Sequence, residues 1–179
     1  MVRGVGVPQR AGPGATPGPA FREFYDVAHP QIYAYLLHRL GGASDLADDL
    51  TQETFMAALR EIRAGGADTL SVPWLMGVAR HKLADHYRRC AREERRLRRV
   101  WSRGQGGGPP ADRELLGPVA LCLDGLPAAQ RAALVLHYAD DLPLEEVAGL
   151  LHRSVAATNA LVARGRETFR RRYEGGDDA

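Results

Sequence analysis

The sequence predicts an all-α protein made of two small helical domains that a flexible linker joins. Alanine and leucine far outnumber the β-branched residues in a chain that is 45% apolar and 7% aromatic, and such a composition favours helices. Apolar residues recur at helical spacing in most segments. Between them, residues 102–113 (SRGQGGGPPADR) are rich in glycine and proline and lack this spacing, which is typical of a linker.

The linker sets the domain boundaries that we expect. It separates a first domain at residues 20–101 from a second at 114–174, and each is long enough to bury a core. Residues 1–19 are rich in glycine and proline, so we expect a disordered tail there. Residues 175–179 form a second short tail.

The first helix of the first domain is predicted between Phe21 and Leu40, where apolar residues follow helical spacing. Pro30 lies inside this segment and either kinks one helix or starts a second. Gly41-Gly42 then ends the helix, because glycine readily adopts the left-handed backbone found at helix C-termini.

The second helix, Asp45 to Arg60, has an unusual charge pattern. Ser44 or Asp45 can cap it, and acids in its first turn complement the helix dipole. An ordinary solvated face mixes charges to form pairs four residues apart, but here no basic residue precedes Arg60. We therefore favour a docking surface for a basic partner helix over plain solvent exposure. One side carries Asp45, Asp48, Asp49, Gln52, Glu53, Met56 and Arg60, with Phe55 and Leu59 at its edge, and we expect Phe55 and Met56 to be exposed.

The third helix is predicted from Trp74 through about Val100, with Pro73 at a first helical position. Its first half, WLMGVARHKLADHYRR, mixes aromatic and basic residues, the combination that stacks on unpaired bases and follows phosphates. Residues 80–103 hold ten Lys/Arg and three acids, which suggests a polyanionic partner. A solvated helix face is the alternative for this run, and core packing is the alternative for Trp74.

The second domain is predicted to consist of short helices. The first covers 114–123 and is interrupted at Gly117-Pro118, and the second begins at Leu126-Pro127. Residues 140–143 form a turn, and a third helix begins at Pro143 or Leu144 and ends at Leu151.

A helix-turn-helix is predicted at the end of the second domain. The three-residue turn 152–154 connects the helix that ends at Leu151 to one from Val155 to about Arg172, which Ser154 can cap. Apolar residues of the two helices face each other across the turn. A helix-turn-helix commonly binds DNA, and five arginines on its last helix make this interpretation more specific. They are Arg164, Arg166, Arg170, Arg171 and Arg172.

Several classes of protein fit the sequence poorly. Cys90 and Cys122 have no CxxC partner, so we expect no disulfide framework and a reducing cytoplasm. No apolar run approaches 18 residues, and no signal peptide is evident, so we expect no membrane insertion. His86 and Cys90 are four residues apart, but no further metal ligands match them. Without a phosphate loop or a nucleophile elbow, we expect no catalytic residues, no metal and no cofactor.

Two blocks of the sequence resemble a known family. DLADDLTQETF followed by PWLMGVARHKLADHYRR is similar to the second region of bacterial RNA polymerase sigma factors of the extracytoplasmic-function group. The segment LDGLPAAQRAALVLHYADDLPLEEVAGLLHRSVAATNALVARGRETFRR is similar to their fourth region. The resemblance covers roughly residues 20–173, with both blocks in the family's order.

The resemblance implies a non-catalytic subunit that directs promoter recognition, promoter melting and transcription initiation. In the family, the acidic helix docks on the clamp helices of the largest subunit of core RNA polymerase. Many members are held by an anti-sigma factor that covers the same surfaces. The core polymerase-binding residues that we assign on this basis and on the helix face are Asp45, Asp48, Asp49, Gln52, Glu53, Phe55 and Met56.

The resemblance also implies two contacts with promoter DNA. The third helix melts the edge of the transcription bubble and reads the minus-ten element, and the helix-turn-helix reads the minus-35 element in the major groove. For the minus-ten contact, we assign Trp74, His81, Lys82, Tyr87, Arg88 and Arg89. For the minus-35 contact, we assign Arg153, Ser154, Asn159, Ala160, Ala163 and Arg164.

Some positions depart from the family pattern. His81 stands where Asn is frequent, and Asn159 and Ala160 stand where Lys or Arg and Ser are usual, so the promoter sequence does not carry over. His152 replaces a turn glycine and is predicted to adopt a left-handed backbone. A stand-alone helix-turn-helix regulator that dimerises through residues 20–101 is the alternative, but it does not explain the acidic helix.

Overall fold

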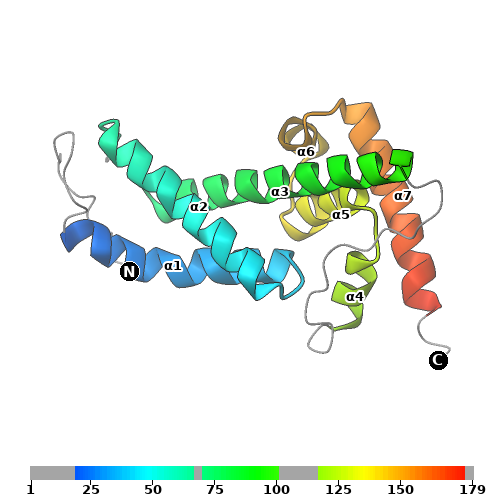
Figure 1. Cartoon of the computed structure of the whole chain (residues 1–179), viewed down its shortest axis with the longest axis horizontal. Helices are drawn as coiled ribbons and strands as arrows, with labels where there is room; N and C mark the ends of the chain where they lie inside the picture. Colours follow the sequence, from blue (N-terminus) through cyan, green and yellow to red (C-terminus); the bar gives the residue numbers. More distant parts are fainter. Residues whose placement is uncertain (1–18, 67–69, 101–116, 176–179) are drawn as a thin grey trace. The chain divides into compact units, whose positions relative to one another are not determined.

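The computed structural model describes residues 19–66, 70–100 and 117–175. Every regular element in these ranges is a helix (Figure 1), which confirms the predicted all-α fold. The predicted linker lies outside the described residues, as do the two predicted tails apart from Pro19 and Gly175, so the predicted domain boundaries stay a prediction. None of the helices in the described ranges is long and apolar enough to cross a membrane.

The chain divides into two compact units. The first comprises Met1–Leu40 and Ser44–Lys82, and the second comprises Gly41–Ala43 and Leu83–Ala179. The boundary between them falls inside a single long helix, α3 (Val72–Val100).

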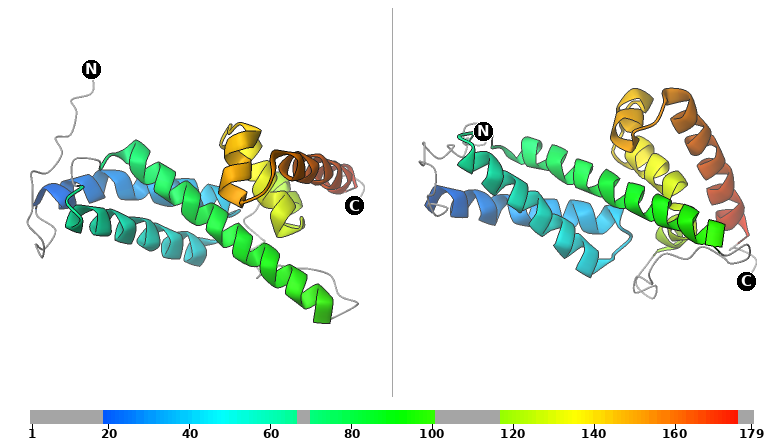
Figure 2. Two further views of the ribbon diagram at one scale, coloured as in Figure 1. Left: turned by 90° about the horizontal axis from the view of Figure 1, so that it is seen from above. Right: turned by 45° about the horizontal axis from the view of Figure 1, so that its top comes forward.

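The first unit contains α1 (Pro19–Arg39), α2 (Ser44–Arg63) and the start of α3. Helix α1 continues through Pro30, so the proline does not start a second helix. Gly41 and Gly42 have φ values of 66° and 85°, as predicted for residues that end a helix. The chain then reverses, and α2 lies beside α1 (Figures 1 and 2).

The core of the first unit is built from one apolar stripe on each helix. Ile32, Leu36, Leu50 and Leu75 are each at most 1% exposed. Burying a leucine or isoleucine side chain fully stabilises a fold by about 1.5–3 kcal/mol. Ser71, which the sequence places in the preceding loop, caps α3, since its hydroxyl accepts a hydrogen bond from the backbone N–H of Trp74 at 3.3 Å.

The second unit adds five helical elements to the rest of α3. They are α4 (Pro118–Asp124), α5 (Ala128–Leu134), the π-helical segment η3 (Val135–Ala139), α6 (Leu144–Leu151) and α7 (Val155–Glu174). Helix α7 packs against α4, α5 and α6. At Gly165 of α7, an added Cβ would lie only 3.0 Å from Cγ of Leu134. A larger residue at this position would require Leu134 to shift, so glycine favours this close approach of α7 to α5.

The predicted helix that begins at Pro127 ends in the π-helical segment η3. The backbone N–H of Asp140 bonds to the carbonyl of Val135, five residues earlier, at 3.1 Å. Asp141 then has a φ of 52°, and His137 Nδ1 donates to the carbonyl of Leu142 at 2.8 Å. Periodicity alone does not predict this wider turn.

Polar contacts join the second half of α3 to the rest of its unit. The guanidinium of Arg88 donates to the carbonyl of Leu150 in α6. The carboxylate of Glu94 accepts from the backbone N–H of Ala128 at 3.0 and 3.2 Å, which satisfies an otherwise unpaired donor at the start of α5.

Candidate functional site

The exposed side of α2 is a continuous acidic strip. We call Asp45, Asp48, Asp49, Gln52 and Met56 the acidic strip, and all five side chains are exposed. Met56 is 48% exposed, as predicted. The opposite side of the helix, with Leu50 and Ala58, is buried. This geometry presents three carboxylates and one thioether on a single helical face.

Phe55 lies beneath the acidic strip, and the prediction that it is exposed is wrong. The side chain is 5% exposed, and its ring lies 4.6 Å from the ring of Tyr25 and 5.9 Å from that of His29, between ring centroids. The reason is the neighbouring helix, because α1 brings two aromatic rings against a position that the α2 periodicity places at the edge. Phe55 therefore anchors α2 on α1.

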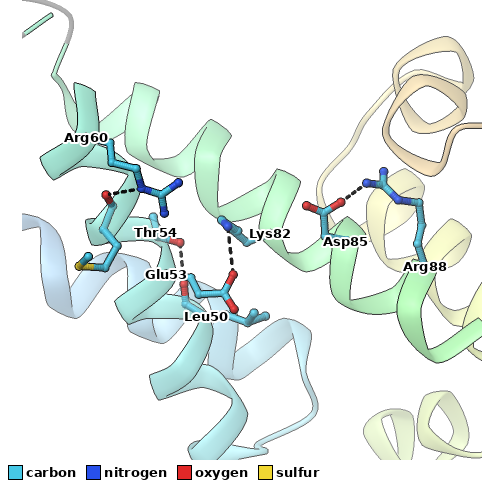
Figure 3. A network of polar contacts seen from close by, with 8 residues as sticks. Leu50, Glu53, Thr54, Arg60, Lys82, Asp85 and Arg88 are labelled. Carbon is cyan, nitrogen blue, oxygen red and sulfur yellow. Dashed lines mark hydrogen bonds and ion pairs between the residues drawn. The ribbon is translucent and has the colours of Figure 1, made fainter. Parts of the chain in front are cut away.

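Glu53 lies beside the strip and is tied to α3. Its Oε2 is 3.0 Å from Nζ of Lys82 (Figure 3). The two side chains are 45% and 24% exposed respectively. One predicted polymerase contact and one predicted DNA contact are thus each other's ion-pair partners within the first unit.

The predicted minus-ten residues differ in how accessible they are. His81 and Arg89 are exposed, and Trp74 is half-buried. Tyr87 is 3% exposed. Arg88 pairs with the carboxylate of Asp85 (Figure 3), and burial lowers the pKa of its guanidinium below the usual value.

The ring of His81 has a defined orientation. Its Nδ1 lies 2.9 Å from the carbonyl oxygen of Gly77, one turn earlier. Because a carbonyl only accepts, Nδ1 donates in this hydrogen bond, and Nε2 is available as an acceptor whenever it carries no proton. The exposed edge of His81 can therefore accept a hydrogen bond from a base amino group.

His86 and Cys90 form a small half-buried pair on α3. Cys90 Sγ lies 3.4 Å from Nε2 of His86. Burial, with Arg89 and Arg131 nearby, lowers the pKa of His86 to about 4, so this ring is neutral at neutral pH. Burial likewise raises the pKa of the Cys90 thiol. In the described ranges, no group of three or more His, Cys, Asp or Glu is placed to hold a metal ion.

The helix-turn-helix has the predicted geometry. His152 adopts a left-handed backbone, with φ 53° and ψ 52°, and the backbone N–H of Arg153 bonds to the carbonyl of Ala148 at 2.9 Å. Ser154 caps α7 by accepting from the backbone N–H of Ala157 at 3.2 Å. Figure 2 shows α6 and α7 joined by this short turn.

The predicted minus-35 residues gather on one side of α7. Asn159, Ala163 and Arg164 are exposed, whereas Ala160 is half-buried. Buried residues on the other side, Thr158, Leu161, Val162 and Gly165, hold α7 against its unit. Arg153 is half-buried in the turn, and Ser154 is exposed but uses its hydroxyl for the cap.

An apolar groove in the second unit was not predicted. It has a volume of about 730 Å³ and lies among α4, α5, η3 and α7. Val119 and Tyr138 line it and are 53% and 56% exposed, and Arg166 and Arg170 line it as well. The sequence contains only an indirect signal of this groove, namely apolar residues on two separate short helices. The spacing of these residues does not reveal that they come together in the fold.

Two family models match the chain. Residues 24–93 match sigma-70 region 2, and residues 116–169 match sigma-70 region 4. The first match contains the acidic strip and most of α3, and the second contains the helix-turn-helix. The order of the two matches is the order that the two sequence blocks predict.

Individual relatives agree with the family models. The chain is 31% identical over 154 residues to the ferric citrate uptake sigma factor FecI of Escherichia coli, covering 82% of this chain and 87% of that protein. It is 27% identical over 157 residues to the ECF RNA polymerase sigma factor SigM of Bacillus subtilis, covering 86% and 95%. The fold is similar to the sigma factor RpoE of Bartonella quintana, solved in complex with the anti-sigma factor NepR, with a TM-score of 0.52 and 22% identity over 86% of this chain and 96% of that one.

Three observations lead to one assignment. They are an acidic helix beside a basic one, a helix-turn-helix with a basic second helix, and two family matches in the expected order. The chain belongs to the sigma-70 family and is an RNA polymerase sigma factor of the extracytoplasmic-function group, which directs transcription initiation.

Proposed function

We propose that the acidic strip of α2 docks on the clamp helices of the largest subunit of core polymerase, while α3 and α7 contact promoter DNA. The observation that carries this proposal is the separation of charge. The exposed strip holds Asp45, Asp48 and Asp49, whereas the exposed side of α7 holds arginines. Carboxylates repel phosphates, so the strip suits a basic protein surface and not DNA.

The minus-ten contact rests on the exposed and half-exposed side chains of α3. Trp74 can stack on an unpaired base, and His81 offers Nε2 as an acceptor because its Nδ1 bonds to Gly77. Arg89 is exposed, and we infer that it contacts a phosphate. Tyr87 is buried, and we infer that it supports the helix instead of stacking on a base.

The minus-35 contact rests on Asn159, Ala163 and Arg164. Their side chains are exposed on one face of the second helix of a helix-turn-helix, the helix that enters the major groove in this motif. Asn can bond to adenine and Arg to guanine through two hydrogen bonds each, and the alanine methyl can contact thymine. Arg170 to Arg172 add salt-sensitive affinity that does not depend on sequence.

We infer that the protein is a non-catalytic specificity subunit, because family membership supplies a function that needs only binding surfaces. An anti-sigma factor is a further partner that we propose. The Bartonella sigma factor of similar fold was solved in complex with one. Such a partner would cover the acidic strip or the exposed side of α7, since these are the surfaces that activity requires.

Run-off transcription and co-purification with core polymerase test the proposal. Asp49→Arg places a positive charge in the centre of the acidic strip, and we expect affinity for core polymerase to fall by at least about tenfold. Asp26→Arg is a matched control, since Asp26 is exposed on α1 and outside the strip. Circular dichroism should give the same helicity for both variants.

Two outcomes would overturn the proposal. One is an Asp49→Arg protein that still co-purifies with core polymerase at the level of the unmodified chain. The other is a stable homodimer that binds an inverted repeat without polymerase, which would favour the stand-alone regulator.

A further inference from the structure

A small cavity in the second unit has a strongly basic lining. It has a volume of about 310 Å³ and lies among α3, α5 and the turn of the helix-turn-helix. We call its basic residues the arginine pocket, and they are Arg88, Arg92, Arg95, His152 and Arg153. All five belong to the second unit. A concave surface lined by one sign of charge attracts ligands of the opposite sign.

The charges of the arginine pocket come from one helix and one turn. Arg88, Arg92 and Arg95 follow one another at spacings of four and three residues, so they share one face of α3. The Nε of Arg95 donates to a backbone carbonyl one turn earlier, at 3.0 Å. Arg153 comes from the turn after α6, and the carbonyl of Leu150 at the end of α6 accepts a hydrogen bond from Arg88.

These charges meet no acidic side chain inside the cavity. Arg88 pairs with Asp85 (Figure 3), but neither Asp85 nor the following acids of α3, Glu93 and Glu94, line the cavity. Burial and the nearby charge of Arg92 lower the pKa of the Arg88 guanidinium, so these two groups repel each other. Like charges held close together cost free energy, and a bound anion would remove that cost.

The floor of the cavity is apolar. It consists of Tyr87, Ala91, Ala132 and Leu151, which are each at most 7% exposed. A simple inorganic anion has no use for such a surface, whereas a ligand that joins phosphates to an organic ring fits both parts of the lining. The volume is at the lower end of the range of about 300–1,000 Å³ found for small-molecule sites. This size suits a nucleotide.

We propose that the arginine pocket binds a nucleoside diphosphate, with its phosphates on the arginines and its base against the apolar floor. Arginine suits this ligand because its planar guanidinium binds phosphate through two parallel hydrogen bonds. Arg88 and Arg153 are also predicted DNA contacts, so a bound nucleotide withholds both from the promoter. This second step rests on the proposed function, whereas binding of the nucleotide does not.

Titration calorimetry of the full chain with ADP, GDP and pyrophosphate tests the site. At low salt, we expect the tighter-binding of the two nucleotides to have a dissociation constant of roughly 0.1 mM or below. Pyrophosphate should bind at least about threefold more weakly, because it leaves the apolar floor uncovered.

Charge-removing variants test the role of the arginines. Arg92→Gln combined with Arg95→Gln removes two charges from the pocket, and neither residue is assigned to a DNA contact. Nucleotide affinity should fall at least about tenfold. Arg22→Gln combined with Arg96→Gln is the matched control, since it removes the same net charge from exposed positions outside the cavity. Because salt screens distant charges, this control should stay within about twofold of the unmodified chain.

A variant without a change in charge tests the cavity itself. Ala129 lines the cavity and is half-buried, so Ala129→Leu adds a side chain to the space that the base would occupy. We expect nucleotide affinity to fall at least about fivefold, because the added atoms exclude the ligand. Ala156→Leu, at an exposed position of α7 outside the cavity, should leave affinity unchanged. Melting temperatures without ligand show whether both variants fold.

Fluorescence anisotropy of a labelled minus-35 duplex tests the competition with DNA. At constant ionic strength, saturating nucleotide should weaken duplex binding by the unmodified chain at least about threefold. The variant with Arg92→Gln and Arg95→Gln should show no such effect at the same nucleotide concentration.

Three calorimetric results would overturn the site: no nucleotide binding, equal losses in the pocket variant and its charge-matched control, or equal affinity for pyrophosphate and the nucleotides. Unchanged duplex affinity at saturating nucleotide would overturn the competition. Failure of the wider proposed function would look different, because the chain would then not bind the duplex even without nucleotide, while calorimetry would still report the site.

Discussion

Helices α2 and α7 have the same length and opposite outer charge. Each is 20 residues long and buries one side in its own unit. The outer side of α2 carries carboxylates, and the outer side of α7 carries Asn159, Arg164 and a C-terminal run of arginines. The shared architecture shows that burial is set by the inner side, and we infer that the partner is set by the residues left outside.

The buried sides of both helices also contain a threonine whose hydroxyl is hydrogen-bonded in the same way. Thr54 in α2 and Thr158 in α7 are fully buried, and each hydroxyl donates to the carbonyl four residues earlier, at 2.7 and 3.1 Å. A buried hydroxyl without a partner would be costly, and these two are satisfied within one turn, whereas the buried hydroxyl of Thr51 in α2 has no hydrogen-bond partner among the described residues. The hydroxyls of Thr54 and Thr158 therefore do not need hydrogen-bond partners among the exposed residues of their helices.

The largest expected effect tests the inner side of α2. Leu50 is 1% exposed beneath the acidic strip, so Leu50→Ala should lower the free energy of unfolding by about 2–5 kcal/mol, through lost burial and the cavity left behind. Met56→Ala, on the exposed side of the same helix, should change stability by less than about 0.5 kcal/mol. Thermal and denaturant unfolding measure both. Equal losses from the two variants would contradict the division into inner and outer sides.

The next effect tests the outer side of α7. Arg164→Ala should weaken binding to a minus-35 duplex by about 1–3 kcal/mol and relax specificity at one base pair. Arg171→Ala, on the same helix beyond the recognition face, should weaken binding to all sequences equally and lower the salt slope by about 1. Competition assays with mutated duplexes distinguish the two. A purely non-specific loss from Arg164→Ala would remove it from the base contacts.

Sequence reasoning predicted the parts of this fold that depend on neighbouring residues. The helix that ends at Leu151, the left-handed backbone of His152 and the cap at Ser154 all match the structure, because turn chemistry acts over three or four residues. The paired apolar stripes of the helix-turn-helix were likewise predictable, since helical periodicity encodes them directly.

The parts that were missed depend on contacts between distant segments. The burial of Phe55 depends on Tyr25 and His29 of another helix. The pairing of Glu53 with Lys82 spans 29 residues. The apolar groove forms only when α4 comes beside α7. Helical periodicity describes one helix at a time, so it places such residues at an edge without showing what covers them.

A smaller effect asks whether Ser154 serves the fold or the DNA. Its hydroxyl caps α7 at 3.2 Å, so Ser154→Ala should lower stability by about 1 kcal/mol. Ser154→Asp keeps a capping oxygen and should retain stability, but its charge faces phosphate and should weaken duplex binding. Chemical denaturation combined with duplex affinity gives both values. If Ser154→Asp bound DNA normally, Ser154 would have only its structural role.

The smallest expected effect concerns the turn that orients α7. His152 has φ 53°, a conformation that costs an ordinary L-residue roughly 1–2 kcal/mol and costs glycine little. The unfolded chain gains entropy with glycine, so His152→Gly should stabilise the protein by only about 0.5 kcal/mol. His152→Ala is the matched control, because it removes the ring but keeps the Cβ. If backbone strain at position 152 limits stability, glycine should raise the melting temperature and alanine should not. A rise or fall shared by both variants would instead mean that the imidazole ring determines the stability at this position.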